Sequence, residues 1–479
     1  MSEISSEIEL ETKTSKLNVL LWSLYDLANT VYSMVIVSLI INQYIIIIGQ
    51  LENGLTYADS EFIYGTVVMV MQIIIAIGMP IAGALSDYAG RRKPFVIVLT
   101  GIILLFASLL GIYQSMWLVL LLYVIANAAY QWSLAFYDAM LPFIAAPKDA
   151  GKVGGFGVAF GYLGTIIGIA AMLVLSKIWG SPNSDPTSLD PVAYGYLNKW
   201  WTYVIAMGIF ALFAIPFIFV KERKKKGVPP PTGQIVKGSF KQLGTTFRDI
   251  RKHGEMFKFI IGWFLVVEVA NVVIIKMILI VRDGMGMSNE FGNYFIIIAT
   301  ISAVLFTYPI GMFADRKGAK LTFILVCAFW VAALIIAIIA STLWSPITAP
   351  ELLGGEEGAP WTFEFVVVLI MGLLAGPALG GTWVAQRYMV IELAPKEKFG
   401  EYMGFSKLSG KVSASLGPLI WAAIIALTEA PTNWDTNYAI ALAIGVMGLI
   451  MLAGLAIILF VKPKKTILEE AGAIPSKVE

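Results

Sequence analysis

The chain has 479 residues, of which 58% are hydrophobic and 14% are charged. Soluble globular proteins carry about 25% charged residues, so this composition excludes a water-soluble fold and favours a membrane protein. The formal net charge of +2 gives no indication of a nucleic-acid partner. The single cysteine, Cys327, excludes an intramolecular disulfide and a cysteine-based metal site.

Apolar runs long enough to cross a bilayer follow one another along the whole chain. A spanning helix needs about 20 apolar residues, and in lipid its backbone must form its hydrogen bonds within the segment. The sequence therefore predicts an all-α membrane protein with twelve transmembrane helices in two six-helix bundles. We expect the spans at 18–48, 61–83, 94–113, 116–140, 154–176, 200–220, 257–281, 289–312, 320–342, 362–386, 404–428 and 436–461.

Lysine and arginine concentrate in alternate loops, and this pattern marks the cytoplasmic side. The opposite loops at 50–61, 113–116, 341–361 and 428–435 contain neither residue, and the exceptions on that side are Lys177, Lys199 and Arg282. Both termini are thus predicted to be cytoplasmic, in a multi-pass protein of the plasma membrane, or of the vacuolar membrane in a eukaryote.

Five regions follow from the spans. We expect an N-terminal tail at 1–17 without the basic start of a signal peptide, and a second tail at 462–479. Two six-helix bundles occupy 18–220 and 257–461. A basic cytoplasmic linker at 221–256 joins them, and it acts either as a solvated topology determinant or as a binder of anionic lipid headgroups.

Two acids lie inside apolar spans, one in the first helix of each predicted bundle. Asp26 is followed at i+3 by Asn29, and Glu268 by Asn271, so each half places a carboxyl and an amide on one helix face. A charge inside the bilayer costs at least about 2.5–3.5 kcal/mol, and a low-dielectric site holds a proton more tightly. We interpret Asp26 and Glu268 as proton-coupling residues, and Asn29, Asn271, Tyr25 and Tyr32 as solute contacts. Hydrogen bonding between packed helices is the alternative.

The pattern G-x-x-x-D-x-x-G occurs twice, at 83–90 and at 311–318. We interpret each copy as a glycine-rich turn after a span, with its aspartate close to following basic residues. Asp87 with Arg91 and Arg92, and Asp315 with Lys320, are then expected to form gating contacts that break during transport. A simple topological anchor is the alternative.

Four more polar residues at or inside span ends are candidates. Asp138 and Lys411 are assigned to gating, although Lys411 could equally pair with a carboxylate. Gln386 and Arg387 lie at the predicted end of the tenth helix, where Arg387 could hold a substrate carboxylate with both arms of its guanidinium.

The duplication extends to the glycine-rich helices. Ala146-Pro147-Lys148 followed by Gly161 and Gly168 matches Ala394-Pro395-Lys396 followed by Gly410 and Gly417. Correspondences in the same order indicate parallel repeats, which are typical of secondary transporters.

These motifs resemble the Major Facilitator Superfamily, whose loop motif between the second and third helices is similar to 83–92. More narrowly, the segments 22–29, 136–142, 157–164 and 404–411 resemble the autophagy-linked vacuolar effluxer branch. The first resemblance implies that helices one, four, seven and ten line a central cavity, and the second implies amino-acid export. The chain departs from the branch pattern at Asp138 and at 401–403.

The sequence therefore predicts a secondary active transporter that moves a small polar solute by alternating access, coupled to protons and acting as a monomer among membrane lipids. Sugar:cation symport and multidrug export remain alternatives within this fold, and a membrane sensor or scaffold without transport is an alternative of another class. No nucleotide-binding loop, cofactor motif or metal-ligand cluster is recognised, so the chain is not expected to be an enzyme.

Overall fold

The computed structural model describes residues 14–180, 195–197, 199–222, 253–287, 289–342, 363–395, 398–432 and 436–462. Helices make up the secondary structure of these residues, and the all-α prediction is confirmed. Most of the two predicted tails and of the basic linker lies outside the described residues.

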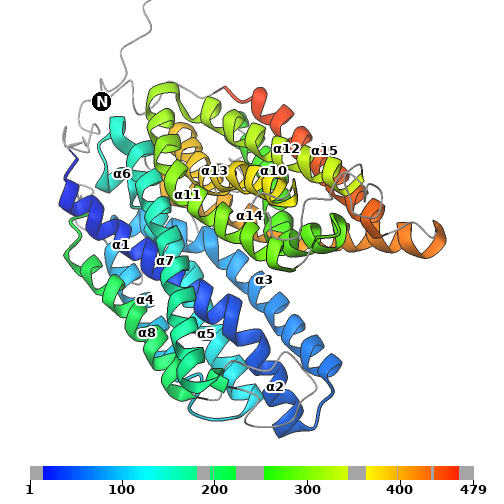
Figure 1. The fold of residues 1–479 in the computed structure, drawn as a ribbon. Coiled ribbons are helices and arrows are strands. Elements are labelled where there is room, and N and C mark those ends of the chain that lie inside the picture. Colours follow the sequence, from blue (N-terminus) through cyan, green and yellow to red (C-terminus); the bar gives the residue numbers. More distant parts are fainter. Residues whose placement is uncertain are drawn as a thin grey trace, which may run out of the picture. The chain divides into compact units, whose positions relative to one another are not determined.

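The first half of the chain forms eight α-helices before the linker region, counted over the described residues (Figure 1). They are α1 Lys16–Tyr32, α2 Ile41–Asn53, α3 Tyr57–Ala89, α4 Lys93–Ser108, α5 Met116–Asp138, α6 Leu141–Ile144, α7 Ala150–Trp179 and α8 Trp200–Ala214. A π-helical segment, Ser33–Ile40, joins α1 to α2, and a 3-10 turn, Ile215–Phe219, extends α8.

The second half contains α10 Gly254–Leu279, α11 Asn289–Lys317, α12 Ala319–Thr342, α13 Phe363–Leu393, α14 Phe399–Thr432 and α15 Thr436–Leu459. A π-helical segment, Ile280–Gly284, follows α10. Both first helices of the two halves therefore end in π-helical backbone, which occurs frequently at functional sites.

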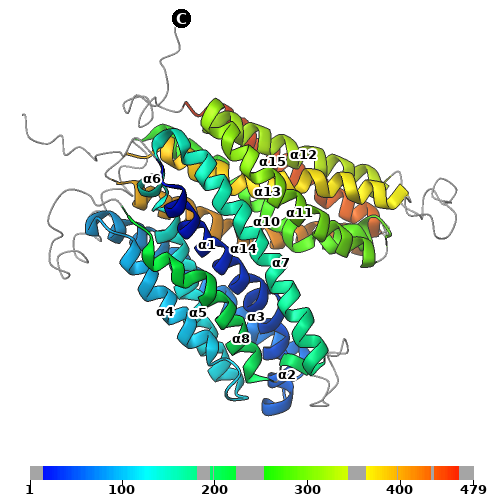
Figure 2. The same cartoon turned by 60° about the vertical axis from the view of Figure 1, so that its left-hand side comes forward.

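The chain divides into two units of packed helices, and each is described by itself. Unit 1 comprises Met1–Ala146, Phe160–Leu243 and Glu397–Gly404, and unit 2 comprises Pro147–Ala159, Gly244–Lys396 and Phe405–Glu479. The first turns of α7 thus belong to unit 2, and the first turns of α14 belong to unit 1. Within unit 1, helices α1, α4, α5 and α8 lie side by side in both views (Figures 1 and 2).

Each of the twelve expected spans overlaps a described helix, and the one expected at 94–113 is shorter, because α4 ends at Ser108. Ten helical segments are long and apolar enough to cross a membrane, and α4 is a shorter apolar helix of 16 residues. Large apolar side chains on their outer faces are more than half exposed, for example Leu105, Leu212, Leu305 and Leu449. Such residues suit lipid as a solvent, because lipid imposes no penalty on exposed apolar surface.

Local signals explain where α3 begins and ends. Thr56 caps its start, because the Thr56 hydroxyl accepts from Asp59 N at 3.1 Å and also donates to Asp59 Oδ2 at 2.6 Å. These hydrogen bonds hold the pKa of Asp59 below its usual range. At the other end Gly90 has φ +66°, a left-handed conformation that glycine adopts without a steric cost.

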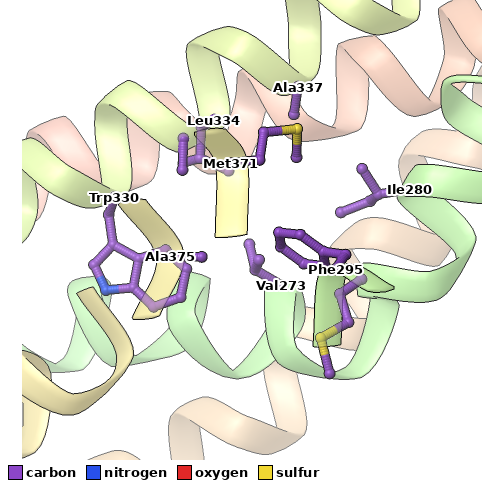
Figure 3. Close-up of a pocket in the computed structure, with 10 residues that line it drawn as sticks. Val273, Ile280, Phe295, Trp330, Leu334, Ala337, Met371 and Ala375 are labelled. Atoms are coloured by element: carbon purple, nitrogen blue, oxygen red, sulfur yellow. The ribbon is translucent and has the colours of Figure 1, made fainter. Parts of the chain in front are cut away.

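Unit 2 contains a small apolar cavity of about 20 Å³ among α10, α11, α12 and α13 (Figure 3). Phe295, Trp330, Leu334 and Met371 contribute to its wall together with small alanines. This volume is near the lower limit for one water molecule, and the lining offers a water almost no polar partner. The cavity is therefore a packing defect and not a site for a polar solute.

Candidate functional site

The first copy of the repeated motif is helical, and the prediction of a turn over its full length is wrong. Residues 83–89 form the last two turns of α3, and the chain turns only at Gly90. A Cβ at Gly83 would collide with the carbonyl oxygen of Gly400 at the start of α14. Glycine is needed here for close helix approach and not for a bend.

Asp87 and Arg92 form a buried ion pair, with Arg92 Nη2 donating to Asp87 Oδ1 at 2.8 Å. The guanidinium also lies over the ring of Phe143, 3.9 Å from its centroid, and Arg92 Nη1 is 3.8 Å from Glu222 Oε1. Arg91, which was assigned to the same contact, is exposed. Arginine suits this role because its planar fork serves two acids and stacks on an aromatic face.

The same two acids also cap helices. Glu222 accepts from the backbone N–H groups of Arg92 and Lys93 at the start of α4, at 2.8–3.0 Å. Asp87 Oδ2 accepts from Glu401 N at the start of α14 at 2.9 Å. Helix N-termini carry unpaired N–H donors and a partial positive charge. Each carboxylate therefore accepts hydrogen bonds from these donors and is also attracted by the positive end of the helix.

The second motif copy is built differently, although it too is helical up to Gly318 at φ +84°. Asp315 accepts from Gly151 N at 2.6 Å and from Lys152 N at 2.7 Å, at the start of α7. The expected contact between Asp315 and Lys320 is not formed, because Lys320 Nζ donates to the carbonyl oxygen of Leu459 at the end of α15, at 2.6 Å.

Asp26 is buried in unit 1, in the third turn of α1. Its Cγ would lie 3.5 Å from a Cβ at Gly161 of α7, which is an ordinary van der Waals distance, so the carboxyl group packs against that glycine. Asn29, one turn later, is also buried, and neither polar atom of its side chain has a hydrogen-bond partner among the described residues. An unsatisfied buried amide calls for an explanation such as a ligand or an ordered water.

Glu268 is buried in unit 2, and its Oε1 atom has no hydrogen-bond partner within the described part of the chain. Its Cγ would lie 3.2 Å from a Cβ at Gly417 of α14. Asn271 is half-buried on the next turn of α10.

The two acids lie at different positions along their own helices. Asp26 packs against Gly161, whose repeat partner is Gly410, whereas Glu268 packs against Gly417. Seven residues separate those two glycines of α14, and Glu268 is also four residues further from the start of its helix than Asp26. Glu268 therefore lies about 6 Å deeper along its helix, at about 1.5 Å per residue.

The two candidate tyrosines are buried in aromatic clusters of unit 1. Tyr25 shares a 2.8 Å hydrogen bond with the Thr100 hydroxyl, and its ring packs against Tyr137 and Phe217. These contacts occupy both its ring and its hydroxyl, so the structure gives Tyr25 a packing role. Tyr32 packs against Tyr130, with ring centroids 4.8 Å apart.

The remaining candidates lie on α5, α13 and α14. Asp138 is fully buried and is the last residue of α5. The tenth helix continues to Leu393, so Gln386 and Arg387 lie inside it and not at its end. Gln386 Nε2 donates to the Ser406 hydroxyl at 2.8 Å, and Arg387 is 5% exposed. Lys411 is half-buried in the middle of α14.

Sequence reasoning missed two carboxylates that cap helices. Glu222 stands among lysines and arginines, where it reads as one more charge of a solvated segment. Glu392 accepts from Ala319 N at the start of α12, at 2.9 Å.

Among the described residues, no group of three His, Cys, Asp or Glu side chains is placed to hold a metal ion.

Comparison with known proteins identifies the family to which this chain belongs. A sequence model of the Major Facilitator Superfamily matches residues 23–353. An uncharacterized MFS-type transporter, YxiO of Bacillus subtilis (strain 168), is 26% identical over 433 residues, which cover 89% of this chain and 92% of that protein. An uncharacterized protein of Aquifex aeolicus (strain VF5) is 22% identical over 348 residues, covering 72% and 76%.

Solved structures with the same fold include the proton:xylose symporter XylE, with a TM-score of 0.64 and 14% identity, covering 94% of this chain and 96% of that one. A bacterial homologue of the iron transporter ferroportin in an outward-facing state has a TM-score of 0.62 and 13% identity, covering 92% and 98%. The E. coli fucose:proton symporter FucP has a TM-score of 0.60 and 13% identity, covering 91% and 97%. At this identity they establish the fold alone. With the family match over more than half of its length, the chain belongs to the Major Facilitator Superfamily and is a multi-pass membrane transporter, not an enzyme.

Proposed function

We propose that this transporter is a proton-coupled secondary carrier that exports a small polar solute, an amino acid or a similar molecule, by alternating access. It acts as a monomer in the plasma membrane with both termini in the cytoplasm. The observation that carries the proposal is the burial of Asp26 and Glu268 in apolar membrane spans, each packed against a glycine of another helix.

Proton coupling follows from the energetics of those carboxyl groups. A charged acid in a span costs about 2.5–3.5 kcal/mol, which a bound proton removes. Glu268 Oε1 has no hydrogen-bond donor among the described residues that would offset this cost. The acids therefore bind protons while they are excluded from water and release them when their side of the path opens.

Solute contacts are assigned to polar groups near the acids. Asn29 offers an amide whose donor and acceptor have no hydrogen-bond partner in the described structure, and Tyr32 offers a hydroxyl in the same condition. Asn271, Gln386 and Arg387 supply further polar groups from unit 2. Tyr25 is left out of this set because its hydroxyl and ring are engaged within unit 1.

Gating is assigned to the motif aspartates, because both bind the first turn of a glycine-rich helix. Asp87 binds the start of α14, and Asp315 binds the start of α7. These hydrogen bonds form only while the helix ends are close, so they stabilise one conformation of the cycle and break in another. Asp138 and Lys411 are proposed to stabilise the alternate conformations.

The test uses the full-length protein in proteoliposomes with an imposed pH gradient. Labelled amino acids are compared with xylose and fucose, since two solved structures of this fold are sugar symporters. In the double variant Asp26→Asn/Glu268→Gln we expect solute exchange to continue while pH-driven accumulation is lost. Glu52→Gln, which changes an exposed acid at the end of α2, is the matched control. Accumulation that survives in the double variant contradicts the coupling proposal.

A further inference from the structure

A row of polar side chains follows one face of α5 inside unit 1. Tyr123, Asn127 and Tyr130 succeed one another at spacings of four and three residues, and all three are buried. Another face of the same helix carries Trp117 and Leu121, whose side chains are more than half exposed. The apolar face therefore suits lipid, and the polar row lies in the interior of the helix bundle.

One end of the row meets the acids of unit 1. The ring of Tyr130 packs against that of Tyr32 on α1, with centroids 4.8 Å apart, and Tyr130 also interacts with the Ser33 side chain. Asp26 of α1 and Asp138 at the end of α5 both interact electrostatically with Tyr130. Tyr130 thus connects the row to the acid that is assigned to proton coupling.

The other end of the row reaches a residue that is not fully buried. Tyr123 interacts with the Tyr64 side chain of α3 and, more weakly, with Tyr32. Tyr64 is half-buried and lies seven residues after Tyr57, the first residue of α3. This separation corresponds to about 10 Å along the helix, at about 1.5 Å per residue. The row therefore extends from the level of Asp26 toward the end of unit 1 at which α3 begins.

Unpaired polar atoms along the row indicate that it binds water. Asn127 Oδ1 has no hydrogen-bond partner among the described residues, and Asn127 Nδ2 donates to Met71 Sδ, a weak acceptor, at 3.5 Å. The Tyr32 hydroxyl and both polar atoms of Asn29 are also without a partner there. Buried polar groups of this kind are costly, and ordered water molecules commonly supply the missing hydrogen bonds.

The chemistry of these groups suits proton transfer. A tyrosine hydroxyl can donate one hydrogen bond and accept another, as water does. When a proton joins the oxygen of such a group, the proton already bound to that oxygen passes to the next one. Each step forms one O–H bond and breaks one, so the tyrosine is left neutral and no other reactant is needed.

The row belongs to one half of the duplicated chain. In the second half α13 takes the place of α5, yet the single tyrosine of α13 is Tyr388, close to its end. A packing role common to both bundles would be expected to recur in both. The contrast therefore favours a task that unit 1 performs alone.

We infer that Tyr123, Asn127 and Tyr130 hold a chain of water molecules that carries protons between Asp26 and the end of unit 1 at which α3 begins. This inference rests on the proposed function, because it supplies the proton route for the coupling acid of unit 1. In the proposed orientation that end is extracellular, so protons enter by this route while solute is exported.

The experiment compares Tyr123→Phe and Tyr130→Phe, which each remove one hydroxyl, with Tyr203→Phe as a matched control. Tyr203 is a buried tyrosine of α8 whose hydroxyl donates to the carbonyl oxygen of Leu197 at 3.2 Å, so the control also loses one hydrogen bond. The full-length protein is placed in proteoliposomes that contain a pH-sensitive dye. Proton movement is recorded when alanine or xylose is added, and counterflow of the same solutes is measured in parallel.

We expect both row variants to slow solute-driven proton movement by about 10-fold or more, since a positioned proton-transfer group commonly contributes about 10²–10⁴-fold. Counterflow should stay within about three-fold of the wild type, because exchange requires no net proton transfer. Tyr203→Phe should leave both rates within the same range. Proton movement that is unchanged in Tyr123→Phe and Tyr130→Phe would overturn the inference.

Asn127→Leu separates a hydrated row from a dry one. In a dry interior, the loss of an amide whose oxygen has no partner should raise the melting temperature. In a hydrated row the same change removes water ligands, so it should lower both the melting temperature and the rate of proton movement. A more stable variant with unchanged proton movement counts against the route.

Failure of the proposed function gives a different result. If the wild type exchanges solute without moving protons, the proposed coupling fails, and hydroxyl-radical labelling by X-ray radiolysis then decides the row. Radicals formed from bound waters modify adjacent tyrosines, so Tyr123 and Tyr130 should be labelled more than Tyr203. Equal labelling of all three tyrosines overturns the hydrated row. The same measurement on the wild type decides it if the phenylalanine variants do not fold.

Discussion

The two copies of the repeated motif have the same pattern and different partners. In unit 1, Arg92 turns back to Asp87 and joins it to Glu222 in a buried network. In unit 2, the residue at the place of Arg92 is Lys320, which reaches the C-terminal carbonyl of α15 instead. The third residue after the 3-10 turn that extends α8 is Glu222, whereas the third residue after α15 is Lys462. Without an acid there, the second copy cannot form the same network.

This contrast separates two ways to stabilise a helix start with an aspartate. Asp87 binds one backbone N–H and a buried guanidinium, so it depends on a side-chain partner. Asp315 binds two backbone N–H groups, which no substitution of a side chain removes, and it also interacts with the Tyr388 side chain. Unit 1 should therefore be the more sensitive of the two to single substitutions around its motif.

The largest expected effect comes from Arg92→Ala. This change leaves Asp87 and Glu222 buried without their guanidinium, and breaking a buried pair costs about 3–5 kcal/mol. Lys320→Ala, at the same motif position of unit 2, removes one contact to a helix C-terminus and should cost about 0.3–1 kcal/mol. Melting followed by tryptophan fluorescence in detergent checks both. Equal losses in the two variants would remove the contrast between the motif copies.

Alanine at the glycines beside the two acids tests how tightly the surroundings of each acid are packed. A Cβ at Gly417 would collide with the Val272 side chain, and overpacking costs about 1–3 kcal/mol. A Cβ at Gly161 would meet the Thr30 hydroxyl at 3.2 Å, which can rotate away. We expect Gly417→Ala to lower the melting temperature and the transport rate more than Gly161→Ala does. The reverse order would show that the packing around Asp26 is the tighter of the two.

Asp315→Asn tests how far charge matters when two backbone N–H groups and the Tyr388 side chain are the partners. The amide oxygen can accept from only one of the two N–H groups, and the charge at the start of α7 is lost. We expect a destabilisation of about 1–2 kcal/mol. The measurement is the midpoint of thermal melting, with Asp59→Asn as a control that removes an exposed capping acid of α3. A loss as large as that of Arg92→Ala would mean that the contact of Asp315 with Tyr388 contributes as much as the two backbone hydrogen bonds.

The smallest expected effect concerns the apolar cavity of unit 2. Ala337→Val adds two methyl groups at its wall, and filling a cavity commonly adds about 0.5–2 kcal/mol of stability. A higher melting temperature with unchanged counterflow would identify the cavity as a packing defect. Loss of transport without loss of stability would instead indicate that helices of unit 2 move into this space during the cycle.

Much of the architecture followed from local patterns. The twelve spans could be located because lipid requires each backbone group to bond within its own helix, so apolar length alone marks a span. The duplication was visible because glycines and aspartates recur at fixed spacing. The predicted helix ends were less accurate than the predicted spans. At Arg387, for example, the polar residues that seemed to end the span at 386 are buried inside a longer helix.

Side-chain partners could not be predicted, because they depend on which helix ends meet. The sequence placed Asp315 near Lys320, but a backbone pair at the start of α7 occupies its carboxylate. Tyr25 lies one residue from Asp26, yet the helix turns it toward Thr100 and Phe217. Neighbours in sequence point in different directions on a helix, since each residue rotates about 100° from the last.

The sequence by itself determined the membrane-spanning, duplicated character of this protein, because hydrophobic length and repeat spacing are properties of the chain alone. Only the tertiary structure decided that Asp26 packs against Gly161 and Glu268 against Gly417, that Glu222 closes the network of Arg92, and that Lys407 lies over the ring of Trp383. Each of these facts depends on the register at which helices pack, and residues far apart along the chain set that register.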